Sequence, residues 1–258
     1  MIGFVLGIGE GRAILSHVNK YTDEIVVSTA TEYGYEIYKE FKAKHFNYRP
    51  LNEDEFKDLI TKFGIDTFVD ASHPYACEVS KTLIKVCNDL NIEYIRYERK
   101  SYFNDLKDNE NIIFIDKYEY LEELFKNIDG NILNTTGSNN ALKIEGLKSE
   151  KNRIIHRILP SPKVISRLLD NGISMENIIA IKGPFGFEIN NGIIKEYKIK
   201  ALITKDSGEE GGMKEKIDSA LINNVKIIVI KRLEVNYGSK FNNIEEMINF
   251  IFLNNSFL

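Results

Sequence analysis

The chain has 258 residues, with 34 Lys and Arg against 38 Asp and Glu, and a formal net charge of -4 at pH 7. Hydrophobic residues make up 43% and charged residues 28%, which is typical of globular chains and excludes a collagen-like, low-complexity or disordered role. No basic excess indicates nucleic acid as a partner, because binding of that polyanion depends on clustered Lys and Arg.

The first residues carry no basic segment ahead of an apolar stretch, and no uncharged apolar run reaches the roughly 18 residues of a membrane helix. We therefore expect a cytoplasmic protein without a membrane partner. Cys77 and Cys87 form neither a disulfide framework nor a metal-ligand spacing, and the four histidines are scattered, so we expect buried thiols and no metal site.

Short β-branched runs alternate with longer amphipathic runs along the whole chain, which predicts βαβ units and a mainly parallel sheet flanked by helices. The predicted strands are Ile2–Ile8, Glu24–Thr29, Thr67–Ala71, Ile92–Tyr97, Ile112–Ile115, Asn131–Thr135, Arg153–Arg157, Ile178–Lys182, Lys200–Thr204 and Lys226–Ile230. The predicted helices include Glu53–Phe63, Glu78–Asp89, Tyr118–Asn127, Pro162–Asn171 and Met213–Asn223.

So many strands indicate two domains rather than one. The polar stretch 101–111 has no apolar periodicity and is the expected linker. The expected fold class is therefore α/β, with two Rossmann-like domains at 1–100 and 112–240 and an active-site cleft between them. The run 241–258 is expected to end in a helix over Ile244–Phe252, and the sequence does not say which domain it packs on.

Ligands of parallel α/β sheets bind beyond the carboxyl ends of the strands, so the loops after the strands are the candidate sites. The first loop, Gly7-Ile8-Gly9-Glu10-Gly11-Arg12, joins a strand to a helix start and could bind a pyrophosphate through its backbone, or could simply be a tight turn. The second strand ends in Val27-Ser28-Thr29-Ala30-Thr31 without an acidic residue, which favours NADP over NAD if a dinucleotide binds; Thr31 could also cap the next helix.

The third strand leads into Asp70-Ala71-Ser72-His73-Pro74-Tyr75-Ala76, where a histidine and a tyrosine could serve a reaction that needs a proton. Helix capping by Ser72 or His73 is the alternative. In the second half, Asn134–Asn139, Lys182–Gly186 and Thr204–Gly212 are dense in Gly, Ser, Thr and Pro, and together they indicate a polar ligand site at the end of a sheet.

Taken as a set, these loops closely resemble one family, the precorrin-6A reductases of corrin-ring (cobalamin) biosynthesis. The matching segments, in chain order, are Glu10–Arg12, Val69–Ala76, Ile95–Arg99, Thr135–Ser138, Arg157–Pro162, Gly183–Phe185 and Thr204–Gly208 with Gly211, Gly212 and Lys216. The first glycine loop is one residue shorter than the family's usual Gly-Gly-Thr-x-Glu pattern.

The resemblance implies an NADPH-dependent reductase that delivers a hydride to one double bond of a tetrapyrrole macrocycle, precorrin-6A or its cobalt form, with a proton added at the adjacent carbon. The proton could come from a side chain or from ordered water. A monomer or a small homo-oligomer would suit this role. Two alternatives stay open, namely an NADP-dependent oxidoreductase for a smaller substrate and a non-catalytic nucleotide-binding sensor.

The resemblance also assigns roles to residues of this chain. The expected cofactor-binding residues are Gly7, Gly9, Glu10, Ser28 and Thr29, with Thr136, Gly137 and Ser138 closing over the cofactor. The expected catalytic residues are His73, Tyr75, Lys205 and Asp206. The expected substrate-binding residues are Ser72, Arg157, Lys182, Ser207, Gly211 and Gly212, which would include counter-charges for the carboxylate arms of the macrocycle.

Overall fold

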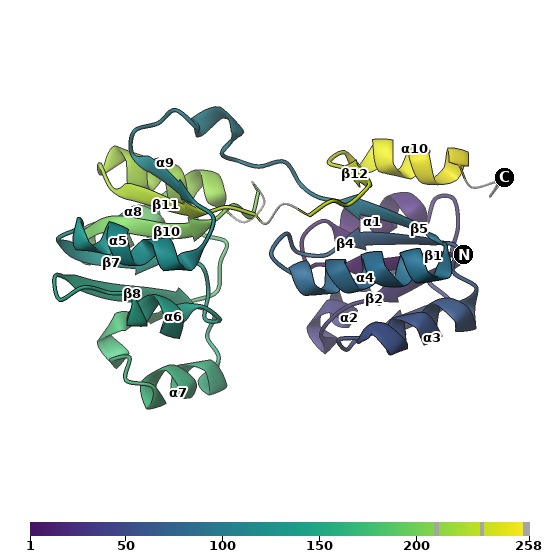
Figure 1. The fold of residues 1–258 in the computed structure, drawn as a ribbon, viewed down its shortest axis with the longest axis horizontal. Helices are drawn as coiled ribbons and strands as arrows, with labels where there is room; N and C mark the ends of the chain where they lie inside the picture. The colour runs from purple at the N-terminus through teal and green to yellow at the C-terminus, as the bar shows by residue number, and fades with distance from the viewer. Residues whose placement is uncertain (209–211, 233–234, 255–258) are drawn as a thin grey trace. The chain divides into compact units, whose positions relative to one another are not determined.

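A computed structural model describes residues 1–208, 212–232 and 235–254 of the chain (Figure 1). The chain divides into two compact units, Met1–Lys100 with Leu233–Leu258, and Ser101–Arg232. Each unit holds one six-stranded sheet in which every recorded strand pair is parallel. This confirms the predicted α/β class with two Rossmann-like sheets.

In the first unit the strand order is β12-β5-β4-β1-β2-β3. Its strands are β1 (Ile2–Leu6), β2 (Ile25–Ser28), β3 (His45–Asn47), β4 (Thr67–Ala71), β5 (Glu93–Tyr97) and β12 (Ser239–Phe241). Its helices are α1 (Gly11–Val18), α2 (Glu32–Tyr38), α3 (Glu53–Phe63), α4 (Cys77–Leu90) and α10 (Ile244–Asn254).

Helices cover both faces of this sheet. Alternate residues of each strand point to opposite faces, so each strand contributes side chains to two cores. Phe4 and its neighbours at Ile2 and Leu6 pack with α1 and α10, whereas Val5 packs with α3 and α4. Met247, Ile248 and Ile251 of α10 belong to the first of these cores, so the C-terminal helix packs on the first unit (Figure 1).

In the second unit the strand order is β6-β11-β10-β7-β8-β9. Its strands are β6 (Ile112–Ile115), β7 (Gly130–Asn134), β8 (Asn152–Ile158), β9 (Ile178–Ala180), β10 (Ile199–Lys205) and β11 (Lys226–Ile230). Its α-helices are α5 (Leu121–Lys126), α6 (Ala141–Gly146), α7 (Pro162–Asp170), α8 (Phe187–Glu196) and α9 (Met213–Ile222), and its 3₁₀ turns are η1 (Asn104–Leu106), η2 (Tyr118–Tyr120) and η3 (Met175–Asn177).

The helices again cover two faces. Leu133, Ile155 and Leu202 of the central strands pack with α8 and α9. Ile158 packs on the opposite face with residues of α6 and α7. The division into two faces determines which side chains at the strand ends lie on the same side of the sheet.

The unit boundaries differ from the expected ones in two places. The stretch 101–111 belongs to the second unit, because Phe103 is buried in its core. Residues 239–241 form β12, which pairs in parallel with β5 and therefore belongs to the first unit. The short strands β3 and β12 are absent from the predicted elements. Among the described residues, no helix is long and apolar enough to cross a membrane.

Candidate functional site

A cavity of about 380 Å³ lies at the carboxyl ends of β1, β2 and β4 in the first unit. Its lining includes five of the residues predicted for the cofactor or the substrate from the strand-end loops: Gly7, Gly9, Ser28, Thr29 and Ser72. Arg49, Arg99 and His73 add basic side chains to the wall. Among the described residues, no Asp or Glu lines this cavity, so its polar surface suits an anionic ligand.

The glycine loop after β1 is held by its backbone. Gly7 donates its N–H to the carbonyl of Ala71 at 3.0 Å, and its carbonyl accepts a hydrogen bond from the hydroxyl of Tyr38. A Cβ added at Gly7 would lie 3.2 Å from the backbone nitrogen of His73, and one added at Gly11 would overlap the Tyr38 ring. These two glycines therefore allow the loop to lie against β4 and α1 to begin beside α2.

Burial raises the pKa of Tyr38 to about 12, with the carboxylate of Glu10 adding to the effect. The phenol therefore keeps its proton and remains a donor to the glycine loop at physiological pH. Glu10 is the N-cap position of α1, is itself buried, and pairs with Arg99, whose NH2 lies 2.8 Å from its carboxylate. Glu10 therefore fixes Arg99 in the cavity wall rather than lining the cavity itself.

Hydroxyl groups and one arginine surround the end of β2. Asn47 of β3 donates its side-chain amide to the hydroxyl of Ser28 at 2.8 Å and to the carbonyl of Arg49 at 2.6 Å. Thr31 is the N-cap of α2, where its hydroxyl accepts the N–H of Gly34, which confirms the predicted capping. Arg49 lines the cavity and makes an ion pair with Glu55 at the start of α3.

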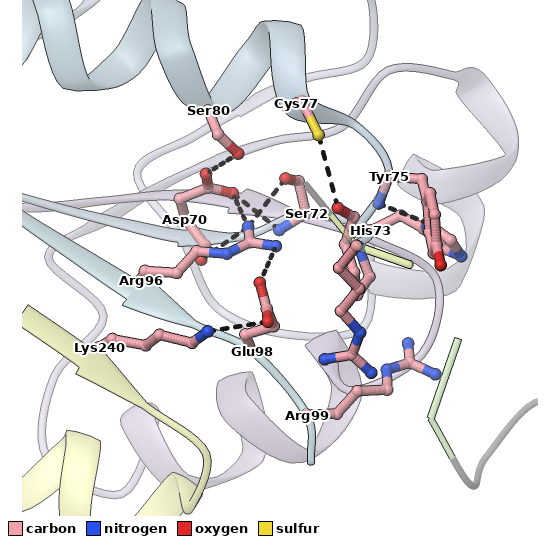
Figure 2. Close-up of polar contacts among 12 residues, drawn as sticks. Asp70, Ser72, His73, Tyr75, Cys77, Ser80, Arg96, Glu98, Arg99 and Lys240 are labelled. Carbon is pink, nitrogen blue, oxygen red and sulfur yellow. Dashed lines mark hydrogen bonds and ion pairs between the residues drawn. The ribbon is translucent and has the colours of Figure 1, made fainter. Parts of the chain in front are cut away.

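A buried charged network underlies the loop after β4 (Figure 2). The carboxylate of Asp70 accepts from NH1 of Arg96 at 2.8 Å, from the hydroxyl of Ser80 at 2.6 Å and from the N–H of Ser72 at 2.9 Å. Arg96 and Asp70 are fully buried, and Arg96 also donates to the Ser72 hydroxyl at 3.1 Å. Helix α4 begins at Cys77 without a side-chain cap, so capping by Ser72 or His73 is wrong.

The network continues along β5 to the edge strand β12. NH2 of Arg96 lies 3.6 Å from the carboxylate of Glu98, which in turn accepts from Lys240 at 2.9 Å (Figure 2). The guanidinium carbon of Arg96 lies 5.2 Å from the centre of the Tyr237 ring. Segments far apart in the sequence therefore fix the position of Ser72 at the cavity.

His73 and Tyr75 lie together after Ser72. Their ring centroids are 5.9 Å apart, and the Tyr75 N–H donates to Nδ1 of His73 at 3.2 Å (Figure 2). A neutral His73 ring with this bond carries its proton on Nε2. His73 is exposed and lines the cavity, so it can exchange a proton there.

In the second unit, the predicted residues after β7 surround a buried amide. Asn134 accepts the N–H of Thr136 at 2.9 Å and its hydroxyl at 2.8 Å, and its amide nitrogen lies 3.1 Å from Nδ1 of His156. Nε2 of His156 lies 3.0 Å from Glu145. Gly137 and Ser138 follow in the same loop at the carboxyl edge of the sheet, so this network fixes where the loop begins.

The remaining predicted residues lie on several strand ends of the second unit. Arg157 is half-buried on β8, Lys182 is exposed after β9, Lys205 and Ser207 are half-buried at and after β10, and Gly212 is the N-cap of α9. Asp206 is buried and pairs with Arg232, whose Nε lies 3.2 Å from its carboxylate. Gly211 lies outside the described residues. In the part of the chain that the structure describes, no group of three or more His, Cys, Asp or Glu could hold a metal ion.

Three residues at these two sheet edges were not predicted as site residues, namely Arg49, Arg99 and Lys216. Arg49 follows β3, which was not predicted, so its place beside Ser28 could not be inferred. Lys216 had a usable signal, because it lies three residues after Met213 and one before Ile217, on the apolar side of α9.

The chain is similar to known proteins in sequence and in fold. The family described as precorrin-6x reductase CbiJ/CobK matches residues 2–251. A cobalt-precorrin-6A reductase of Methanocaldococcus jannaschii is 36% identical over 234 residues, covering 88% of each chain. One of Priestia megaterium is 31% identical over 253 residues, covering 96% of each. The solved structure of a CobK precorrin-6A reductase has a TM-score of 0.76 at 14% identity, covering 97% of this chain and 95% of the other, which supports the fold.

Proposed function

The chain belongs to the precorrin-6x reductase family, and on this premise we propose that it reduces one double bond of the cobalt-precorrin-6A macrocycle with NADPH, giving cobalt-precorrin-6B. Family membership makes it an oxidoreductase. The cobalt form is proposed because the relatives from M. jannaschii and P. megaterium carry that name. Comparing turnover of cobalt-precorrin-6A with that of metal-free precorrin-6A tests this choice, and faster reduction of the metal-free form would contradict it.

One observation carries the choice of cofactor. The cavity at the end of β2 is lined by Ser28, Thr29 and Thr31, which carry hydroxyls, and by Arg49. No described Asp or Glu lines it. An NAD site places an acidic residue on the ribose diol at this position, whereas an arginine accommodates the 2′-phosphate of NADP. The residues present therefore fit NADPH, which supplies the hydride when it is bound.

The rest of the cavity suits the same cofactor. The close approach of Gly7 to β4 leaves backbone rather than side chains at the end of β1, and α1 begins directly after the loop, so free N–H groups can bind a pyrophosphate. Arg99, fixed by Glu10, adds a positive charge to the wall. We propose these groups for orientation of the nucleotide and His73 or Tyr75 for delivery of the proton.

Two substitutions test the cofactor assignment. Arg49→Met removes the positive charge and should raise the KM for NADPH by about tenfold or more, since hydrogen bonds between charged groups contribute ~1.5–3 kcal/mol. Thr31→Asp keeps an N-cap side chain and should weaken NADPH through charge repulsion while leaving NADH unaffected. Arg153→Met, at a half-buried arginine of the second unit that does not line the cavity, is the charge-matched control. Equal loss for NADH and NADPH would contradict a 2′-phosphate site.

The proton donor is tested with solvent isotope effects on reduction by Tyr75→Phe and His73→Ala. The donor's substitution should lower kcat and change the isotope effect, because proton transfer then depends on another group. Unchanged rates in both variants would exclude these side chains and leave ordered water as the source.

A further inference from the structure

The hydroxyl of Ser28, at the end of β2, has a fixed hydrogen-bonding role. Asn47, the last residue of β3, donates from its side-chain amide nitrogen to this hydroxyl at 2.8 Å and to the backbone carbonyl of Arg49 at 2.6 Å. A carbonyl can only accept, so the nitrogen and not the oxygen of the Asn47 amide must face this side. The Ser28 oxygen therefore accepts from Asn47, and its own proton points in another direction.

The Ser28 proton is available to a ligand in the cavity. Ser28 lines the cavity, although only 4% of the residue is exposed. Within residues 1–208, 212–232 and 235–254, no residue accepts a hydrogen bond from this hydroxyl. A buried donor that has no acceptor costs free energy, so an acceptor in the cavity would be bound favourably at this point.

The neighbouring hydroxyls differ in what they can donate. Thr29 donates to the carbonyl of Thr31 at 3.0 Å, so its proton is already bonded within the protein. Thr31 accepts the N–H of Gly34 at 3.2 Å as the cap of α2, which leaves its own proton for another acceptor. Arg49 also lines the cavity, and its guanidinium offers only donors. This end of the cavity thus suits a phosphate group, whose oxygens accept hydrogen bonds from hydroxyls and from a guanidinium.

We propose that Asn47 is a positioning residue for the choice of cofactor, because it orients the Ser28 hydroxyl as a donor to the 2′-phosphate of NADPH. This inference rests on the proposed function, which supplies a cofactor with that phosphate. Among the described residues, Ser28 lines the cavity and Asn47 does not, so Asn47 acts through Ser28. An NAD site binds the ribose diol with an acidic acceptor, so a serine fixed as a donor favours the phosphate over the diol.

The test compares Asn47→Asp and Asn47→Leu, two substitutions of similar volume, with the control Asn131→Leu. Asn131 is a half-buried asparagine of β7, in the second unit, and its amide also donates to a backbone carbonyl, that of Tyr197 at 2.6 Å. NADPH and NADH are titrated separately by the fluorescence of the reduced nicotinamide. The ratio of the Kd for NADH to the Kd for NADPH is the decisive quantity, because a purely structural residue would weaken both cofactors alike.

The two Asn47 variants should differ in degree. Asn47→Asp should raise the Kd for NADPH about tenfold or more, because a carboxylate accepts the Ser28 proton and repels the phosphate. Asn47→Leu should raise it about threefold, because the hydroxyl then samples roughly three staggered positions, of which one points at the phosphate. Both variants should leave the Kd for NADH unchanged, and Asn131→Leu should change neither Kd.

Removal of the Ser28 hydroxyl tests the route of the effect. In a Ser28→Ala background, Asn47→Leu should change the Kd for NADPH less than it does in the unmodified protein, because the two side chains are coupled. An equal change in both backgrounds would overturn action through Ser28. An unchanged Kd ratio in both Asn47 variants, or an equal loss of affinity for NADPH and NADH, would overturn the positioning role.

Reduction of cobalt-precorrin-6A by the unmodified protein separates failure of this inference from failure of the proposed function. Reduction with NADPH, together with an unchanged Kd ratio in both Asn47 variants, would overturn the positioning role alone. A lower ratio of the Kd for NADH to the Kd for NADPH in both variants, together with no reduction by the unmodified protein, would support the positioning role and reject the reaction.

Discussion

The buried charge of Lys216 predicts an unusual dependence of stability on pH. Its pKa is about 7 in the fold, against 10.5 for an ordinary lysine. Between these two pH values the unfolded chain binds more protons than the folded chain. The free energy of unfolding therefore increases with pH, because Lys216 loses its proton and its charge in the folded protein. The free-energy cost of burying the charged ammonium is present in full below about pH 7. It decreases as the pH rises from about 7 towards 10.5.

The expected magnitude follows from the same values. Each pH unit well inside the interval changes the free energy of unfolding by up to about 1.4 kcal/mol, so the change from about pH 7 to about pH 9 is ~2 kcal/mol. Lys216→Met lacks the titrating group and should be more stable than the unmodified protein at pH 7, by a margin that shrinks by that amount at pH 9. Arg157 stays charged over most of this range, because its pKa is about 10.

Urea unfolding followed by far-UV circular dichroism measures this difference, which suits a chain with no tryptophan. Equal m-values for the two proteins would show that the comparison concerns stability alone. A margin between the two proteins that is the same at both pH values would refute the reasoning, since it would mean that Lys216 is not a charged and buried group in the fold.

Two further substitutions test the first unit. Gly11→Ala should destabilise the protein by about 1–3 kcal/mol and weaken NADPH binding, because the added methyl overlaps the Tyr38 ring. Gly146→Ala is the matched control and should be neutral or stabilising, because its methyl meets nothing within 4 Å. Arg96→Met should lower the free energy of unfolding by about 3–5 kcal/mol, because it leaves the buried Asp70 carboxylate without its cation. A decrease of less than about 1 kcal/mol in urea unfolding would contradict a coupled Asp70–Arg96 pair.

Most of the fold was predictable because its strong elements are local. The helix Glu53–Phe63 has the predicted bounds, since an Asn52–Glu55 capping box begins it and Gly64, with a left-handed backbone, ends it. Strands β3 and β12 were not predictable, because each has three residues and exists through pairing with a neighbouring strand. The polar residues on either side of Phe103 indicate a linker, whereas its burial depends on tertiary contacts within the second unit.

The candidate site shows the same limit. Gly7 and Ser28 were found because the end of a predicted strand locates them, and both line the cavity. Arg49 was missed because its position depends on β3, and the partnership of Asp70 with Arg96 was missed because it joins side chains from adjacent strands 26 residues apart. Strand-end loops can thus be read from sequence, whereas the side chains that support them require the strand order.

The charge distribution bears on how such a protein would recognise its ligands. The chain carries a net charge of -4, and NADPH and a tetrapyrrole with carboxylate arms are both anions, so long-range attraction does not favour either. Recognition must then depend on cations within a few ångströms of each ligand, where screening by salt is weak for buried groups. Arg99 has this character, because only 15% of its side chain is exposed in the wall of the first cavity. Its contribution should consequently appear in dissociation rates more than in association rates, because groups that lie inside a site act after encounter.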